Sequence, residues 1–173
     1  MVFQQYSLFP WRTVLENISF GPQMKGKRRK KREEMARKYI KLTGLDQFED
    51  SYPHELSGGM QQRAALARAL AHEPDVLLMD EPFGALDERT RHRLQHVLLD
   101  IQKREHKTIL FVTHAIDEAI FLADRLLVMR DRPGRVMHDF KIDIERPRDR
   151  LSPAFKQYHL EIRDKLEDVL AVR

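Results

Sequence analysis

Three short apolar runs separated by helical patterns constrain the fold of this chain most strongly. The runs are residues 76–79, 108–113 and 126–129, and the segments between them carry apolar residues at helical spacing. None of the runs alternates cleanly between apolar and polar residues, which is typical of strands buried on both faces of a parallel sheet. Residues 136–140 add a predicted edge strand. Because strand and helix alternate, we expect an α/β fold with a parallel sheet.

The first third of the chain and its last segment are predicted to be helical. Apolar residues recur at helical spacing in residues 13–20 and 33–45, and Gly44 is a predicted C-cap for the second of these helices. Ser152, followed by proline, is a favourable N-cap for a last helix. The basic stretch 146–150 before that helix is expected to be a solvated linker.

Composition excludes several classes of protein. The 173 residues contain no cysteine, which excludes disulfides and thiolate metal sites. No apolar run approaches the ~20 residues needed to cross a bilayer, and we expect no signal peptide. The formal net charge of +4 favours an acidic partner, which is a nucleic acid, a nucleotide or an anionic membrane face.

A serine and two glycines begin a helical pattern in the middle of the chain. They are Ser57, Gly58 and Gly59, and Gln61 follows closely. Glycines let a phosphate approach the backbone, and the free N–H groups at the start of a helix attract an anion. The alternative is a plain N-cap with a flexible entry turn, and this stretch alone does not separate the two interpretations.

Two adjacent carboxylates, Asp80 and Glu81, follow the apolar run 76–79. Ligands of open α/β sheets bind at the carboxyl ends of strands. There one carboxylate can hold Mg²⁺ through water, and the second can orient or deprotonate an attacking water. A strand that ends in solvated acids is the alternative. His114 follows the next run, within reach of a phosphate at the same edge, although a lone histidine is more often structural.

The order and spacing of these stretches resemble the motifs of ATP-binding cassette (ABC) ATPases. Residues 56–63 resemble the signature motif, 76–82 the Walker B motif, 85–87 the D-loop, His114 the H-loop, and Val2-Phe3-Gln4 the Q-loop. Flanking segments at 8–17, 52–56, 113–119 and 132–135 resemble the nitrate, sulfonate and taurine importer branch of that family.

This resemblance implies the C-terminal part of a P-loop NTPase (RecA-like) core together with the ABC helical subdomain. The phosphate-binding loop of the family, G-x-x-x-x-G-K-[ST], does not occur in the sequence, so we expect the N-terminal strands and the P-loop to be absent. A chain that lacks them leaves sheet edges and apolar faces uncovered, and is expected to be marginally stable or to need a partner. The expected divisions are a Q-loop segment (1–11), the helical subdomain (12–72), the core portion (73–145) and a C-terminal linker and helix (146–173).

The resemblance also implies roles for individual residues. In the family, two ATPase subunits sandwich two ATP molecules with Mg²⁺. Asp80 would help to hold Mg²⁺, Glu81 would be the general base, His114 would contact the γ-phosphate, and Gln4 would sense Mg²⁺ and the attacking water. Ser57, Gly58, Gly59 and Gln61 would contact the ATP that the partner subunit holds, and Asp87 would link the two sites.

The partners that the resemblance implies are transmembrane permease subunits, a second ATPase subunit and, indirectly, a periplasmic or lipoprotein solute-binding protein. The chain would then lie at the cytoplasmic face of the membrane, with Phe9, Pro10 and Trp11 near the surface that receives the permease. Two alternatives stay open, a non-catalytic truncated subunit that docks on a permease or an intact ATPase, and a DNA-associated ATPase. The last is disfavoured because no long coiled coil precedes the signature motif, so no nucleic acid partner is expected. The basic run 25–32 is expected to be an exposed loop and helix start, because no aromatic residues are interleaved with it. Binding of nucleic acid or of anionic headgroups is the alternative for this run.

Overall fold

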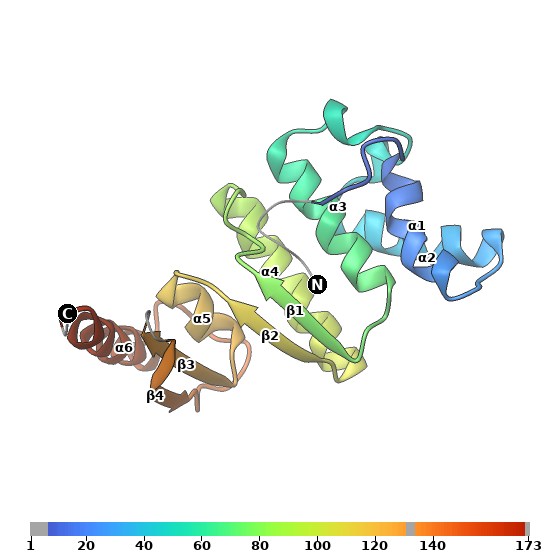
Figure 1. Cartoon of the computed structure of the whole chain (residues 1–173). Coiled ribbons are helices and arrows are strands. Elements are labelled where there is room, and N and C mark those ends of the chain that lie inside the picture. The colour runs from blue at the N-terminus through green and yellow to red at the C-terminus, as the bar shows by residue number, and fades with distance from the viewer. Residues whose placement is uncertain (1–6, 131–133, 172–173) are drawn as a thin grey trace. The chain divides into compact units, whose positions relative to one another are not determined.

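The computed structural model describes residues 7–130 and 134–171, which contain six α-helices and four strands (Figure 1). Gln4, predicted to be a site residue, lies outside the described residues. The chain divides into two compact units, Met1–Val112 and Thr113–Arg173. No helix in the two described stretches combines the length and the apolar character that crossing a bilayer requires.

Three helices of the first unit pack on one another: α1 (Val14–Met24), α2 (Arg29–Thr43) and α3 (Gly58–Ala71). Short 3-10 turns at Asp46–Phe48 and Pro53–Glu55 connect α2 to α3. The core between them is centred on Ile18, Tyr39 and Leu66, which are each at most 1% exposed.

The ends of these helices follow from local sequence. Thr13 forms a capping box with Glu16: its hydroxyl accepts from the Glu16 amide at 3.3 Å, and the Glu16 carboxylate accepts from the Thr13 amide at 3.1 Å. At the C-terminal end of α2, Gly44 has a φ of +66° and ends the helix. This left-handed conformation is one that glycine adopts without penalty, and the predicted C-cap is confirmed.

The first two apolar runs form a parallel pair of strands, as the sequence predicts. β1 (Val76–Asp80) pairs with β2 (Thr108–Val112), with Leu78 opposite Leu110. The connection between them is α4 (Glu88–Glu105), which runs along the pair in Figure 1. A parallel pair needs such a crossover, and a helix provides it.

Only one face of this strand pair is covered. Leu77 and Met79 are buried, whereas Val76, Leu78, Leu110 and Val112 are 54%, 37%, 58% and 49% exposed. The burial on both faces that the apolar runs indicate is therefore wrong for the described residues, whereas the uncovered apolar face expected of a chain without the N-terminal strands is found. Among the described residues no element packs on the second face of this pair, so the side chains that point from it stay exposed.

The second unit contains α5 (Ile116–Leu122), β3 (Arg125–Arg130), β4 (Arg135–Lys141) and α6 (Pro153–Ala171). The third apolar run, β3, pairs antiparallel with the predicted edge strand β4. The described strands thus form one parallel and one antiparallel pair, and the predicted α/β fold with a parallel sheet is confirmed. α6 begins after Ser152, whose hydroxyl accepts from the Phe155 amide at 3.3 Å, which confirms the predicted N-cap.

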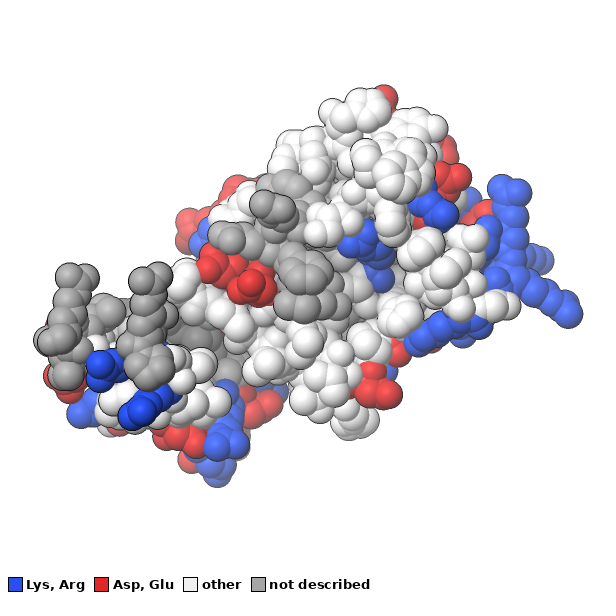
Figure 2. Space-filling view, viewed as in Figure 1, with Lys and Arg blue, Asp and Glu red and all other residues white. Residues whose placement is uncertain are grey.

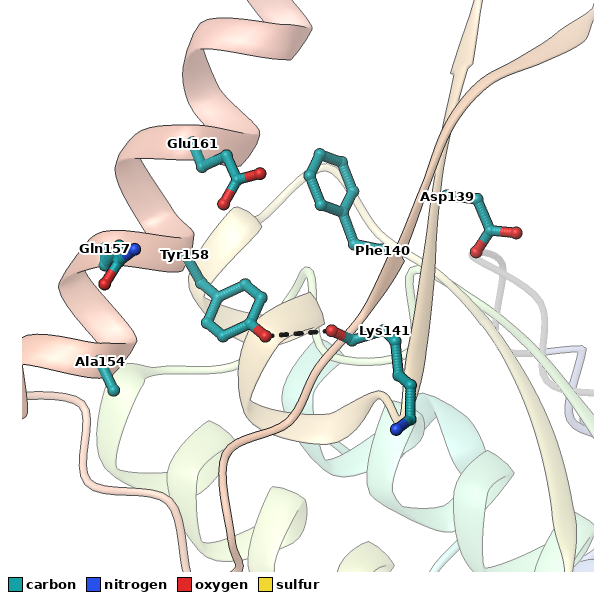
Figure 3. Close-up of a pocket in the computed structure, with 7 residues that line it drawn as sticks. All are labelled: Asp139, Phe140, Lys141, Ala154, Gln157, Tyr158 and Glu161. Atoms are coloured by element: carbon teal, nitrogen blue, oxygen red, sulfur yellow. Dashed lines mark hydrogen bonds between the residues drawn. The ribbon is translucent and has the colours of Figure 1, made fainter.

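A shallow groove lies between β4 and α6 (Figure 3). Within it the Tyr158 hydroxyl donates to the Lys141 carbonyl at 3.1 Å and accepts from the Asp143 amide at 3.2 Å. These bonds fasten α6 to the end of β4. None of the residues that line the groove belongs to the motifs that the sequence analysis identified.

Arg148 is buried, although its segment was expected to be a solvated linker. Only 6% of the residue is exposed, and burial lowers the pKa of its guanidinium. The side chain donates to backbone carbonyls at the end of α5 and after β4: Ile120 at 2.7 Å, Phe121 at 3.2 Å, Ala123 at 2.6 Å, Ile142 at 3.2 Å and Ile144 at 3.0 Å. The prediction of a solvated linker is wrong at this position, because the guanidinium satisfies carbonyls that the helix end leaves unpaired.

The one-sided burial of β1 predicts different responses at two neighbouring leucines. Leu77→Ala is expected to lower the free energy of unfolding by about 2–4 kcal/mol, because it opens a cavity in a packed core. Leu78→Ala, on the opposite face, is expected to lower it by less than about 1 kcal/mol. Urea denaturation followed by circular dichroism measures both values, and equal losses would contradict the exposed face.

Candidate functional site

The Ser-Gly-Gly stretch forms the start of α3. Ser57 is the N-cap residue, and its hydroxyl accepts from the Met60 amide at 3.4 Å. The Gln61 side chain donates to the Leu56 carbonyl at 3.2 Å, which holds the entry turn against the helix. Ser57 and Gly58 are exposed. The stretch is therefore both an N-cap and an exposed helix start with amide groups directed outward, which is the geometry that attracts an anion.

The carboxylate pair lies where β1 ends. Asp80 is the last residue of the strand, Glu81 follows it, and both are half-buried. The Glu81 amide donates to the Val112 carbonyl at 2.9 Å, so the backbone at Glu81 is fixed to the end of β2.

Glu81 has a left-handed backbone conformation with a φ of +45°. Such a conformation disfavours a residue with a side chain by ~1–2 kcal/mol and persists only where the surroundings hold it. Two hydrogen bonds hold this backbone in place, because the Glu81 carbonyl oxygen accepts from the Gly84 amide at 3.2 Å and from the Gln62 side chain at 3.2 Å. Backbone strain of this kind occurs preferentially at functional sites, and here it falls on a predicted catalytic carboxylate.

Gln62 joins the helix start to the loop after β1, and the sequence analysis did not identify it. Its side chain donates to the Glu81 carbonyl and accepts from the Ala85 amide at 3.1 Å, and the residue is 1% exposed. The residue recurs at helical spacing with the buried Leu66 and Leu70. A lone glutamine on an otherwise apolar helix face was the sequence feature that pointed to a buried polar contact.

The loop between β1 and α4 is packed from two directions. Phe83 is 1% exposed, and the centroid of its ring lies 5.6 Å from the ring centroid of Phe111 on β2. On the other side a side chain at Gly59 would be in ordinary contact with Ala85 and Leu86, 3.6 and 3.4 Å away. The first turn of α3 therefore lies directly against this loop.

Asp87 ends the loop as the N-cap of α4. Its carboxylate accepts from the Thr90 amide at 2.9 Å, and this bond holds the pKa of Asp87 below its ordinary value. Within the first unit, the structure thus brings together the start of α3, the Asp80–Glu81 pair and the segment that ends at Asp87.

His114 belongs to the second unit, where it is exposed. Its neighbour Thr113 donates to the Glu118 carboxylate at 2.7 Å and accepts from the Ala115 amide at 3.0 Å, which fixes the turn into α5. The structure therefore places His114 on an ordered turn after β2, and its proximity to the carboxylate pair stays a prediction.

The carboxylate pair is a partial set of ligands for a cation. Among the described residues, no group of three or more histidine and acidic side chains could hold a metal ion. Mg²⁺ is usually bound through one or two carboxylates together with substrate phosphates and waters. Asp80 and Glu81 therefore fit Mg²⁺ only in the company of phosphate oxygens.

The segment before α1 presents an exposed tryptophan on an ordered turn. Trp11 is 71% exposed. Asn17, which is fully buried, holds this turn: its side chain accepts from the Phe9 amide at 2.8 Å and donates to the carbonyls of Phe9, Arg12 and Thr13 at 3.1, 2.9 and 3.0 Å. The role of Asn17 was also not identified from the sequence.

Known proteins resemble this chain in sequence. The ABC transporter family profile matches residues 1–84. An uncharacterized ABC transporter ATP-binding protein of Methanocaldococcus jannaschii is 55% identical over 97% of this chain and 63% of its own length. A taurine import ATP-binding protein of Rhizobium johnstonii is 49% identical over 84% of this chain and 56% of its own. A nitrate import ATP-binding protein of Synechocystis is 48% identical over 92% of this chain and 59% of its own.

A solved structure agrees with the fold. A dimeric ATP-binding cassette in a post-hydrolysis state, bound to ADP and Pi, matches with a TM-score of 0.75 at 35% identity, over 83% of this chain and 62% of that one. The fold is thus α/β and matches part of an ATP-binding cassette, consistent with the C-terminal part of a P-loop NTPase core. The comparisons confirm the predicted resemblance to ATP-binding proteins of ABC transporters, and the chain spans 56% to 63% of the length of the three relatives named above.

Gln62 and its neighbour Gln61 provide a matched test of the site. Gln62→Ala leaves the Glu81 carbonyl and the Ala85 amide without their buried partner, and we expect a loss of about 2–4 kcal/mol in the free energy of unfolding. Gln61→Ala removes one partly exposed bond and is expected to lose less than about 1 kcal/mol. Chemical denaturation of both variants measures the difference, and an equally small loss at both positions would contradict the bridging role of Gln62.

Proposed function

We propose that this chain acts in the ATP-binding subunit of an ABC importer for a small solute such as nitrate, a sulfonate or taurine, and that it powers transport through a membrane permease. The observation that carries the proposal is the strained carboxylate turn at Asp80 and Glu81, which Gln62 ties to the start of α3. The taurine and nitrate import relatives support the class of solute.

The residues divide into two groups by the nucleotide that they would serve. Asp80 would hold Mg²⁺, Glu81 would take a proton from the attacking water, and Gln4 and His114 would contact the water and the γ-phosphate. Bound Mg²⁺ supplies neutralisation of phosphate charge. This first group needs a phosphate-binding loop beside it, and the sequence contains no G-x-x-x-x-G-K-[ST].

The second group would serve a nucleotide that another subunit holds. The exposed start of α3 carries Ser57, Gly58, Gly59 and Gln61. The amide groups there would be open to a phosphate of the nucleotide that a second ATPase subunit holds. Asp87, on the loop packed against Gly59, would link the two sites. In this proposal residues 12–72 are the helical subdomain and 73–145 the core portion, with 1–11 as the Q-loop segment and 146–173 as the C-terminal linker and helix.

The division of the site residues into these two groups predicts that the chain does not hydrolyse ATP alone but completes the site of an intact partner subunit. Losing one preorganised donor already costs about 3–4 kcal/mol of transition-state stabilisation, and the whole phosphate loop supplies several. The alternative function, a non-catalytic subunit that docks on a permease or an intact ATPase, shares this expectation. At the cytoplasmic face of the membrane, the permease and, indirectly, a solute-binding protein would be the further partners.

A mixing experiment tests the proposed division of the site. The chain is added to a full-length importer ATPase whose own signature motif has been inactivated, and ATP turnover is followed by phosphate release. We expect no turnover by the chain alone and restored turnover in the mixture. Ser57→Arg, which blocks the start of α3, is the control and is expected to restore none. Robust turnover by the chain alone, or equal restoration by Ser57→Arg, would contradict the proposal.

The exposed Trp11 predicts a permease contact that can be separated from folding. Trp11→Ala is expected to change the free energy of unfolding by less than about 0.5 kcal/mol, because the side chain is largely in water. Its association with permease-containing vesicles is expected to weaken about 10-fold or more, since buried tryptophans dominate interface energies. Leu160→Ala, an exposed apolar residue of α6, is the control. Equal effects of the two substitutions on association would refute a specific contact at Trp11.

A further inference from the structure

The proposed function leaves one strongly charged feature unexplained. Seven of the eight residues from 25 to 32 are lysine or arginine. The structure places them in the turn from α1 into α2 and in the first turn of α2, and we call this segment the basic turn. Figure 2 shows blue side chains projecting from the region where Figure 1 draws the junction of α1 and α2, with little red among them. The predicted exposed loop and helix start is thus confirmed, and its charge density needs a physical account.

The charge of the basic turn is only partly balanced within the chain. Arg29 pairs with Glu33 at 2.7 Å, but Glu33 also serves Arg37 at 3.8 Å. Lys31 pairs with Glu34 at 3.3 Å, with both side chains at least 60% exposed. The seven cations exceed the formal net charge of the whole chain, +4, so the rest of the chain is net negative.

Four of the seven cations of the basic turn, Lys25, Arg28, Lys30 and Arg32, have no ion pair within the described part of the chain. Of these, Arg28 and Lys30 are exposed, whereas the Lys25 ammonium donates to the His72 carbonyl. Lys27 reaches the Glu73 carboxylate only at 4.0 Å. Exposed pairs of this kind contribute little to stability, so intramolecular pairing does not explain why the charges are there.

Helix stability does not explain them either. The first turn of α2 contains no acidic residue, and its N-cap, Arg28, makes no side-chain capping bond. Cations at the start of a helix oppose the helix dipole, and a helix selected for stability has acidic residues there. A local conflict of this kind in an otherwise consistent fold marks a segment that serves a function. An external anion is the partner that relieves it.

The surroundings of the basic turn favour a membrane surface over a nucleic acid. Met24, immediately before it, is an apolar side chain that is 61% exposed, and Gly26 lies in open space with a φ of +72°. Residues 24–34 contain no aromatic side chain, and binding of single-stranded nucleic acid relies on aromatic stacking. An exposed apolar residue beside clustered lysine and arginine is the combination that binds anionic headgroups.

We propose that the basic turn binds the phosphate headgroups of anionic phospholipids and so holds this part of the chain against the membrane surface. The inference rests on the proposed function in one respect, which is that an importer subunit works beside a membrane. The contact is electrostatic, falls off within a Debye length and therefore weakens as salt is added.

Vesicle co-sedimentation of the full chain tests this proposal. Vesicles of phosphatidylcholine with phosphatidylglycerol are expected to bind the chain, and vesicles of phosphatidylcholine alone are not. The double variant Arg28→Gln, Lys30→Gln is expected to lower the partition coefficient about 10-fold or more, since each cation near an anionic surface contributes roughly fivefold. The matched control, Lys103→Gln with Arg104→Gln, neutralises the same two residue types in the last turn of α4 and is expected to change it less than about twofold.

The outcomes separate the proposal from its alternatives. Equal binding to both kinds of vesicle, or equal losses in the two double variants, would overturn it. The proposal would also be overturned if the chain bound a single-stranded RNA more tightly than anionic vesicles and the Arg28 and Lys30 variant lost that RNA binding. Circular dichroism establishes whether each variant is folded. If the Arg28 and Lys30 variant does not fold, the salt dependence of the unsubstituted chain decides instead: vesicle binding that does not weaken as salt is added overturns the proposal. The vesicles contain neither nucleotide nor permease, so a failure here leaves the mixing experiment with ATP unaffected.

Discussion

A buried amide, the side chain of Gln62, is the interaction on which the site of this protein depends. One end of the amide donates to the carbonyl of Glu81, and the other accepts from the amide of Ala85. Because a buried backbone group without a partner is costly, the helix that carries Gln62 and the loop that carries Glu81 are held in one arrangement. The start of α3 and the end of β1 are far apart in sequence, and this side chain makes them neighbours.

The same bond explains how a glutamate is held in a strained backbone conformation. Glu81 is fixed at its amide by Val112 and at its carbonyl by Gln62 and Gly84. The surroundings therefore determine the left-handed backbone, and the position of the carboxylate follows from it. A site that must position a carboxylate beside phosphates gains from such rigidity, because the placement is set before the ligand arrives.

Local features of the fold could be predicted from the sequence. The caps at Gly44, Ser57 and Ser152 depend on a few neighbouring residues, and so does the strand character of the apolar runs. The pairing of β3 with β4 could not be predicted, because apolar runs show that strands are present but not which strands pair. The uncovered face of β1 and β2 was expected from the resemblance, since the family's N-terminal strands do not occur in the sequence.

The candidate site was predictable to the extent that motifs mark it. The carboxylates and the serine and glycines were identified because their spacing resembles a known family, whereas Gln62, Asn17 and Arg148 were not. Each of these three makes its bonds to backbone groups, and several of the partners lie on other elements. A sequence shows a polar residue but not the carbonyls that it will meet, so buried polar contacts of this kind emerge only from the structure.

Hydrogen exchange at one amide tests the central claim most directly. If the Gln62 side chain joins α3 to the loop after β1, the amide proton of Ala85 exchanges slowly in NMR experiments, at a rate comparable with the amides in the middle of α3, although Ala85 itself is exposed on a loop. Exchange as fast as that of an unstructured loop amide would show that the bridge does not hold in solution, and the account of the site would be wrong.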